Sequence, residues 1–117
     1  MTSPLVERYW VHSLELFDAR MKELLQLYPD QIEAFELCRN SVGDPVAGFR
    51  MGRGKKNVFL LGREHGHEPV GPCGLVALME GLATGKTPDT GQPFPQAGTI
   101  LDRVKLHMIP IMNPDGA

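Results

Sequence analysis

The sequence predicts an α/β fold, with a mixed sheet that contains an N-terminal hairpin and a βαβ unit. Three observations lead to this class. An apolar stripe of helical period runs through residues 3–28. Two strand-like segments separated by turn residues follow within 32–51. A strand, a helix and a second strand then occupy 57–112, and a crossover of this kind makes its two strands parallel.

One helix is expected over 3–28. Ser3 supplies a hydroxyl cap and Pro4 suits the first turn, whereas Pro29 ends the helix. His12 lies off the apolar stripe, so we expect it on the surface. The stripe itself follows steps of three and four residues and consists of Val6, Trp10, Leu14, Phe17, Met21, Leu24 and Tyr28.

The hairpin is predicted from two apolar segments, 32–39 and 46–51, joined by turn residues at 41–45. A second, basic turn follows at 52–56. We interpret it as a solvated loop rather than an anion-binding site.

The central stretch of the sequence is a short apolar run at 58–61, which is typical of a strand buried on both faces. Four side chains of the metal-ligand type follow at once: Glu64, His65, His67 and Glu68. In open α/β sheets, sites form where strands end at their carboxyl side. The sequence therefore predicts its functional site immediately after this strand.

The rest of the chain completes the βαβ unit. A helix with one apolar face is expected to end at Gly85. The loop at 85–98 is long for a connection, which makes it either functional or mobile. One helical turn at 99–103 leads into a second apolar strand at 104–112, and 113–116 forms a turn.

Composition excludes several classes of function. The 117 residues suffice for one domain, and 42% hydrophobic with 22% charged residues is typical of a soluble globular protein. A net charge of -2 offers no surface for nucleic acid or an anionic membrane. The N-terminus lacks a secretory signal, so a cytoplasmic location is expected. Cys38 and Cys73 are interpreted as reduced structural thiols.

His65 and Glu68 are the candidate metal ligands. A histidine and a glutamate three residues apart, on a turn leaving a strand, can direct an imidazole nitrogen and a carboxylate oxygen at one point. Zinc accepts both donor types, and its catalytic sites use three protein ligands and a water. Gly66 between them gives the backbone the freedom such a turn requires. A solvated polar turn is the alternative.

Three stretches then resemble a known family. Residues 62–71 resemble the first zinc motif of the M14 zinc carboxypeptidases, and of their relatives in the succinylglutamate desuccinylase and aspartoacylase group. Residues 104–116 resemble the peptidase strand that runs into an Asn-Pro-Asp-Gly turn. Residues 28–30 and the hairpin resemble the family's entry into its first strands. The Asn-Pro-Asp-Gly turn favours the peptidase branch.

The resemblance implies that His65 and Glu68 are the first two ligands of one zinc ion per complete domain. Arg63 or Glu64 could orient His65 as a hydrogen-bonding partner, and the alternative is a surface ion pair. In an extended backbone His67 would share a face with His65, so it could be recruited to the metal or stand beside it as a hydrogen-bonding partner, unless the chain bends at Gly66.

By the same resemblance, the third zinc ligand, the substrate-binding arginines and the general base lie downstream of the Asn-Pro-Asp-Gly turn. No catalytic residue is identified in this chain. We therefore expect the N-terminal portion of a longer domain, inactive alone and holding zinc weakly or not at all. His107 lies in an apolar strand, where a hydrogen-bonded histidine is favoured over a ligand.

The implied function is a zinc-dependent metallocarboxypeptidase-like hydrolase that removes C-terminal residues from peptides. One alternative is a deacylase, with an N-acyl amino acid in place of the peptide substrate. Another, of a different class, is a non-catalytic binding or scaffold domain. Self-association through exposed sheet edges is also expected, because the strands of an incomplete sheet keep unpaired edges.

Overall fold

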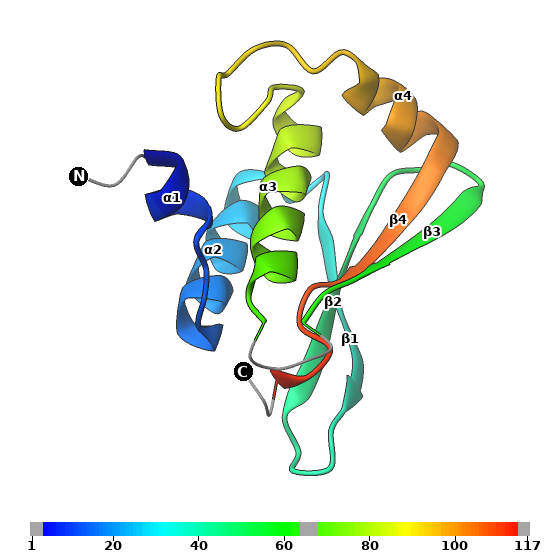
Figure 1. Ribbon diagram of the computed structural model, residues 1–117. Helices are drawn as coiled ribbons and strands as arrows, with labels where there is room; N and C mark the ends of the chain where they lie inside the picture. Colours follow the sequence, from blue (N-terminus) through cyan, green and yellow to red (C-terminus); the bar gives the residue numbers. More distant parts are fainter. Residues whose placement is uncertain (1–3, 64–67, 115–117) are drawn as a thin grey trace.

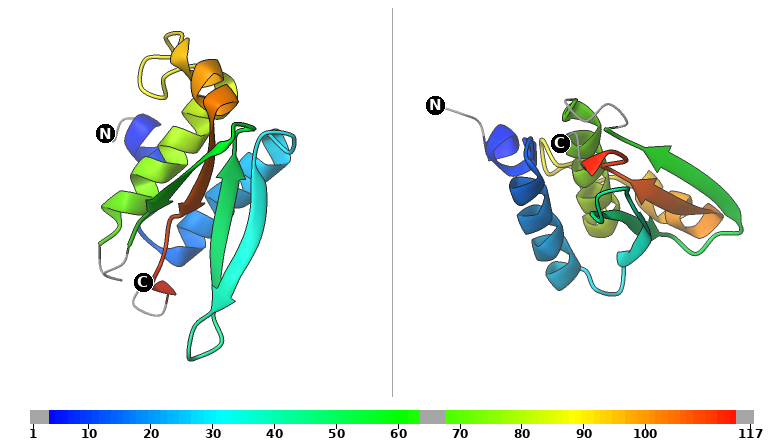
Figure 2. Two further views of the ribbon diagram at one scale, coloured as in Figure 1. Left: turned by 90° about the vertical axis from the view of Figure 1, so that its right-hand side faces the viewer. Right: turned by 90° about the horizontal axis from the view of Figure 1, so that it is seen from below.

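The computed structural model describes residues 4–63 and 68–114. A four-stranded sheet forms one layer, and helices α2 and α3 pack against one of its faces (Figures 1 and 2). The elements in chain order are α1 (Pro4–Tyr9), α2 (Leu14–Leu27), β1 (Glu33–Arg39), β2 (Pro45–Met51), β3 (Lys56–Leu61), α3 (Val70–Thr84), α4 (Gln96–Arg103) and β4 (Val104–Ile109).

The sheet has the strand order β1-β2-β4-β3. β1 and β2 are antiparallel, as are β2 and β4, whereas β3 and β4 are parallel. This arrangement confirms the predicted fold class, a mixed sheet containing a hairpin and a βαβ unit. β4 lies between the hairpin and β3, so the last strand of the chain joins the two halves of the sheet.

The single helix expected over 3–28 is wrong, because the chain leaves the helix after Tyr9 and enters α2 at Leu14. Ser13 caps the second helix, since its hydroxyl accepts a hydrogen bond from the Leu16 amide at 3.2 Å. The break lets Tyr9 and Val11 enter the core, whereas Trp10, expected on the buried stripe, is 47% exposed. The chain therefore breaks the continuous helix and buries Tyr9 and Val11 in place of Trp10.

The expectation that 58–61 is buried on both faces is also wrong. Val58 and Leu60 pack toward the core, whereas Phe59 and Leu61 are 67% and 50% exposed. β3 is an edge strand of the sheet, and the helices of the described chain cover only one of its two faces. Alternate residues of β3 therefore point to solvent.

Two boundaries differ from the sequence prediction. α4 runs over eight residues rather than the single turn expected at 99–103, and it begins directly after Pro95. β4 ends at Ile109 instead of continuing to residue 112. Pro110 follows, and because proline has no backbone N–H it cannot extend the hydrogen-bonded ladder.

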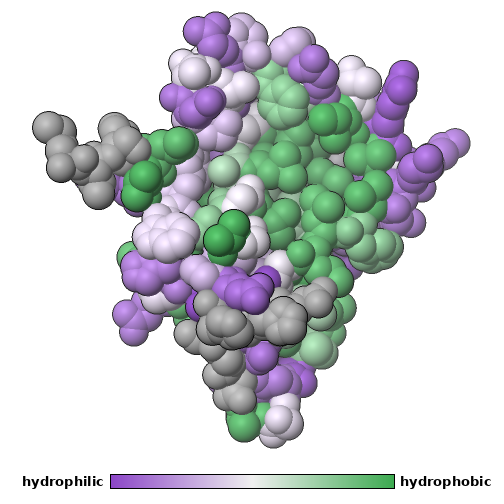
Figure 3. Space-filling model, in the orientation of Figure 1, coloured by the Kyte–Doolittle hydropathy of each residue, from purple (hydrophilic) through white to green (hydrophobic). Residues whose placement is uncertain are grey.

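The core lies between the sheet and the two long helices. Phe17 of α2 meets Phe49 of β2 edge to face, with ring centroids 6.2 Å apart. The largest fully buried apolar side chains come from α2, α3, β2 and β4 and include Leu24, Met51, Val76, Met79 and Met108. Hydrophobic surface also continues over α3 and the strands beside it (Figure 3), so part of this apolar layer faces solvent.

A cluster of charged groups fastens α1 to α3. The Arg8 guanidinium donates two hydrogen bonds to the Glu80 carboxylate, one of them from Nε at 2.6 Å, and the Tyr9 hydroxyl donates a third. Glu80 is only 8% exposed. Glu23 of α2 accepts from Arg8 at 3.0 Å and from Arg20. Helices α1, α2 and α3 therefore meet at one network of carboxylates and arginines.

The network changes the acidities of its members in the way that charge and burial require. The hydrogen bonds from Arg8 lower the pKa of Glu80, although burial opposes this. Burial, followed by the contact with Glu80, raises the pKa of Tyr9 to about 12. Glu80 is therefore ionised and Tyr9 is neutral at physiological pH.

The Glu80→Gln variant should lower the free energy of unfolding by about 2 kcal/mol at pH 7, because Arg8 would lose its charged partner in a largely buried site. The pKa of Glu80 lies below its ordinary value of 4.5 in the folded state. The stabilisation is therefore complete at neutral pH and is lost as the pH falls below that value through the folded-state pKa.

Urea unfolding at pH 7 and at pH 3 measures this effect. Glu23→Gln is the matched control, since it contacts the same arginine from a more exposed position and should cost less than about 1 kcal/mol. Equal losses in the two variants, or a Glu80→Gln loss that persists unchanged at pH 3, would contradict the assignment.

Candidate metal site at the carboxyl ends of β3 and β4

The candidate site lies where the two parallel strands end. The Gly62 amide donates to the Ile109 carbonyl at 3.0 Å, and the Met112 amide donates back to the Gly62 carbonyl at 3.0 Å. One residue further, the Asn113 amide donates to the Arg63 carbonyl at 3.2 Å. These three bonds join the residues that follow β3 to those that follow β4, beyond the ends of both strands.

The two ends of the segment 62–71 meet at a pair of glycines. A Cβ atom on Gly71 would lie 3.0 Å from the Gly62 Cα atom, and a Cβ atom on Gly62 would lie 2.7 Å from the Pro110 carbonyl oxygen. Backbone approach of this closeness requires glycine at residue 62. The segment that carries the predicted ligands therefore leaves the sheet and returns to α3 at nearly one point.

The structure describes one of the two predicted ligands. Glu68 is exposed and lies two residues before α3 begins. His65 lies outside the described residues, as do Glu64 and His67, so their predicted roles stay predictions. Whether the imidazole of His65 and the carboxylate of Glu68 share one ion is likewise a prediction.

Arg63 is buried, with 7% of its surface exposed, although the sequence offered a surface ion pair as one role for it. Its backbone has a φ of 47°. Its guanidinium Nη1 donates to the main-chain carbonyl of His12 at 3.1 Å. The His12 side chain itself is exposed, as expected.

His107 is a hydrogen-bonded strand residue, which confirms the sequence interpretation. Arg50 Nε donates to its Nδ1 at 3.1 Å, so Nε2 carries the proton and donates to the Asn57 side-chain oxygen at 2.8 Å. Its ring stacks on Phe59 with centroids 4.7 Å apart. Burial, then the charges of Arg50 and Lys105, lowers the pKa of His107, so the neutral ring persists at physiological pH.

Both cysteines are free thiols, Cys38 exposed and Cys73 half-buried, as the sequence suggested. Burial raises the pKa of Cys73, so it is a neutral thiol rather than a metal-binding thiolate at physiological pH.

Within 4–63 and 68–114, no group of three or more His, Cys, Asp or Glu side chains could hold a metal ion. The donor types at the candidate site are still those of zinc, an imidazole at His65 and a carboxylate at Glu68. Glu68, the described member of this pair, is exposed and lies two residues before α3, and its carboxylate is a donor that zinc accepts.

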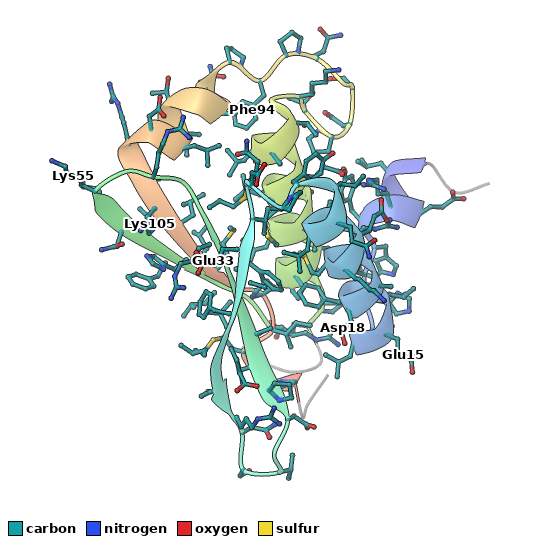
Figure 4. The ribbon with its side chains drawn as sticks, turned by 180° about the vertical axis from the view of Figure 1, so that it is seen from behind. Glu15, Asp18, Glu33, Lys55, Phe94 and Lys105 are labelled. Atoms are coloured by element: carbon teal, nitrogen blue, oxygen red, sulfur yellow. The ribbon has the colours of Figure 1, made fainter. Side chains whose placement is uncertain are left out.

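Hollows also lie elsewhere on the described molecule, and the two larger ones are as follows. One, of about 310 Å³, is lined mainly by apolar side chains of α3 and by Phe94, which lies beside the end of that helix (Figure 4). The other, of about 480 Å³, lies near Glu33 and Lys105 and mixes both signs of charge. The neighbouring basic turn is solvated as expected, since Arg53 is exposed and pairs with Asp102.

The parallel strands β3 and β4 are followed in sequence by His-x-x-Glu and by Asn-Pro-Asp-Gly, the two motifs that resemble those of a zinc-peptidase α/β domain. The family model described as zinc carboxypeptidase, peptidase M14, matches residues 17–117. The chain therefore belongs to the M14 zinc carboxypeptidase family, which confirms the family suggested by its two motifs.

Individual relatives agree. Carboxypeptidase E of Caenorhabditis elegans is 28% identical over 112 residues, which cover 90% of this chain and 23% of the relative. A metallo-carboxypeptidase from Burkholderia cenocepacia is 29% identical, with a TM-score of 0.75 over 93% of this chain and 29% of that one.

Bovine thrombin-activatable fibrinolysis inhibitor, solved with a tick carboxypeptidase inhibitor, shares the fold. Its TM-score is 0.73 at 16% identity, over 94% of this chain and 33% of that one. The chain thus spans about a quarter to a third of the length of these relatives. The shared fold confirms the prediction of an N-terminal portion of a carboxypeptidase fold.

Gly62→Ala should lower the free energy of unfolding by about 2 kcal/mol, because the new methyl group would meet the Pro110 carbonyl and push apart the backbone segments that follow β3 and β4. Gly74→Ala is the matched control within α3, where nothing lies within 4 Å of an added Cβ atom. It should stabilise the protein by about 0.5–1 kcal/mol. Urea unfolding of both variants measures the difference, and similar stabilities would refute the close approach.

Proposed function

We propose that the full-length protein is a zinc-dependent metallocarboxypeptidase that removes C-terminal residues from peptides. One observation carries the proposal: the segment with the predicted ligands and the first residue of the Asn-Pro-Asp-Gly sequence are hydrogen-bonded to each other, from the Asn113 amide to the Arg63 carbonyl. Membership of the zinc carboxypeptidase family supports the same conclusion.

His65 and Glu68 would hold the ion, with Glu68 presented at the start of α3. A zinc ion in such a site polarises the scissile carbonyl and lowers the pKa of its bound water. The contribution of residues 1–117 would be the paired ends of β3 and β4, which hold the backbone that carries the ligands. The third ligand, the base and the groups that hold the substrate carboxylate are proposed to lie beyond the turn at 113–116, so residues 1–117 alone should bind zinc weakly and lack activity.

The proposed substrate is a peptide with a free C-terminus, because the relatives that match are carboxypeptidases. N-acyl amino acids, the substrates of a deacylase, and a non-catalytic scaffold role are outcomes that the experiments below distinguish. In the described chain, no helix is long and apolar enough to cross a membrane. The cytoplasmic location stays a prediction.

Calorimetric titration of zinc into the full-length protein tests the ligands. His65→Ala and Glu68→Ala should each weaken binding by about 4 kcal/mol, or roughly a thousandfold, because each removes one donor from a three-ligand site. His67→Ala is the matched control, a neighbouring imidazole that should leave the affinity near that of the wild-type protein.

Hydrolysis assays complete the test, with a peptide and an N-acyl amino acid as competing substrates. Release of C-terminal residues that is lost in both ligand variants would support the proposal. Cleavage of the acyl substrate alone would favour the deacylase. Negligible zinc binding and no hydrolysis by the wild-type protein would favour the scaffold role.

We further propose that residues 1–117 alone self-associate through β3. This strand ends the described sheet, and Phe59 and Leu61 leave an apolar row on its open face. A second copy of the chain offers the same unpaired edge and the same apolar row, which is what an isologous contact requires.

Sedimentation velocity of residues 1–117 should show association that Phe59→Lys reduces, because a lysine on an edge strand blocks pairing. Val42→Lys is the matched control, an equally exposed apolar residue in the hairpin turn that should leave association unchanged. A sharp monomer peak for the unsubstituted chain, together with a high melting temperature, would contradict this proposal.

A further inference from the structure

We propose that Arg63 is a positioning residue for the metal site, and that the connector between α1 and α2, residues 10–13, is the support that holds it. The proposal rests on the proposed function, since it concerns the segment that carries His65 and Glu68. It assigns a role to a part of the chain that precedes residues 17–117, the stretch that matches the family.

The backbone conformation of Arg63 requires support. Its φ of 47° lies in the left-handed region, and among residues 4–63 and 68–114 it is the one non-glycine residue with a positive φ. A residue with a Cβ atom adopts this conformation only when its surroundings enforce it. This turn sets the direction in which the chain leaves the sheet, two residues before His65.

Arg63 makes hydrogen bonds to two separate parts of the chain. Its carbonyl accepts from the Asn113 amide at 3.2 Å, which ties it to the turn after β4. Its guanidinium donates to the His12 carbonyl at 3.1 Å, which ties it to the connector. Because Arg63 is only 7% exposed, water competes little for the bond to the connector.

The connector is a rigid partner because the residues beside the accepting carbonyl are fixed. Val11 is 3% exposed and belongs to the core, and Ser13 caps α2. Tyr9, just before the connector, bonds to the buried carboxylate of Glu80. His12 contributes its main chain, since its ring lies outside and stacks with Trp10 at 5.9 Å.

The consequence is a mechanical link from the helices to the metal site. Core packing of Val11 and the cap at Ser13 hold the His12 carbonyl in place. This carbonyl accepts the hydrogen bond from the Arg63 guanidinium, and the bond in turn holds Arg63, the residue from which the chain continues to His65. Residues that hydrogen-bond to metal ligands typically change metal affinity 10–100-fold when they are substituted, and Arg63 lies one step further from the ion, so we expect the lower end of this range.

The test compares zinc affinity with stability in the full-length protein. Arg63→Met keeps an apolar stem but removes the donor, and Arg63→Lys keeps one donor for the His12 carbonyl. Arg39→Met is the matched control, because Arg39 also donates to a main-chain carbonyl, that of Gly43 at 2.9 Å, and it lies in the hairpin, outside the network of Glu80. Zinc dissociation constants are measured by chelator competition, and melting temperatures are measured without zinc.

Arg63→Met should weaken zinc binding about tenfold or more, and Arg63→Lys should recover part of the loss. Arg39→Met should leave the zinc affinity unchanged. Zinc binding by Arg63→Met within about twofold of wild type, or an equal loss in Arg39→Met, would overturn the positioning role alone. Failure of the wild-type protein to bind zinc would instead overturn the proposed function, and the positioning role with it.

Discussion

The parallel pairing of β3 with β4 is the constraint on which the site depends. Its register runs from Lys56 opposite Val104 to Leu61 opposite Ile109, and the amides of Gly62, Met112 and Asn113 extend it into the turns. Two segments about fifty residues apart in sequence therefore end at one edge of the sheet. A shift of this register by one residue would move the side chains of β3 to the opposite face of the sheet. It would also break the hydrogen bonds that join Gly62 and Arg63 to the residues after β4.

The helices support the sheet from one face, whereas the other face is open in the described chain. α2 and α3 bury one face, and the carboxylate of Glu80 gathers Arg8 and Tyr9 from α1. That network fixes the start of the connector, whose main chain reaches Arg63. The open face, with Phe59 and Leu61 exposed, belongs to a chain that spans about a quarter to a third of its relatives. Stability and site geometry thus come from the same side of the sheet.

The fold class and the hairpin could be predicted because apolar period and turn residues are local signals. The break between α1 and α2 also had a local signal, the capping residue Ser13, but a stripe of helical period ran across it. The exposure of Phe59 had no local signal, since an apolar strand has the same sequence pattern at the edge of a sheet as at its centre. Burial on both faces is a property of the neighbours, which the residues of one strand do not encode.

The sequence by itself determined the pattern of ligand types, the spacing of His65 and Glu68, and the glycines that such a turn requires, because these depend on side-chain chemistry within a few residues. Only the tertiary structure decided that Arg63 is buried and bonded to the carbonyl of His12, 51 positions earlier. Every residue has a main-chain carbonyl, so no side-chain pattern marks the one that will be used. Its selection follows from how α1, α2 and the sheet pack together.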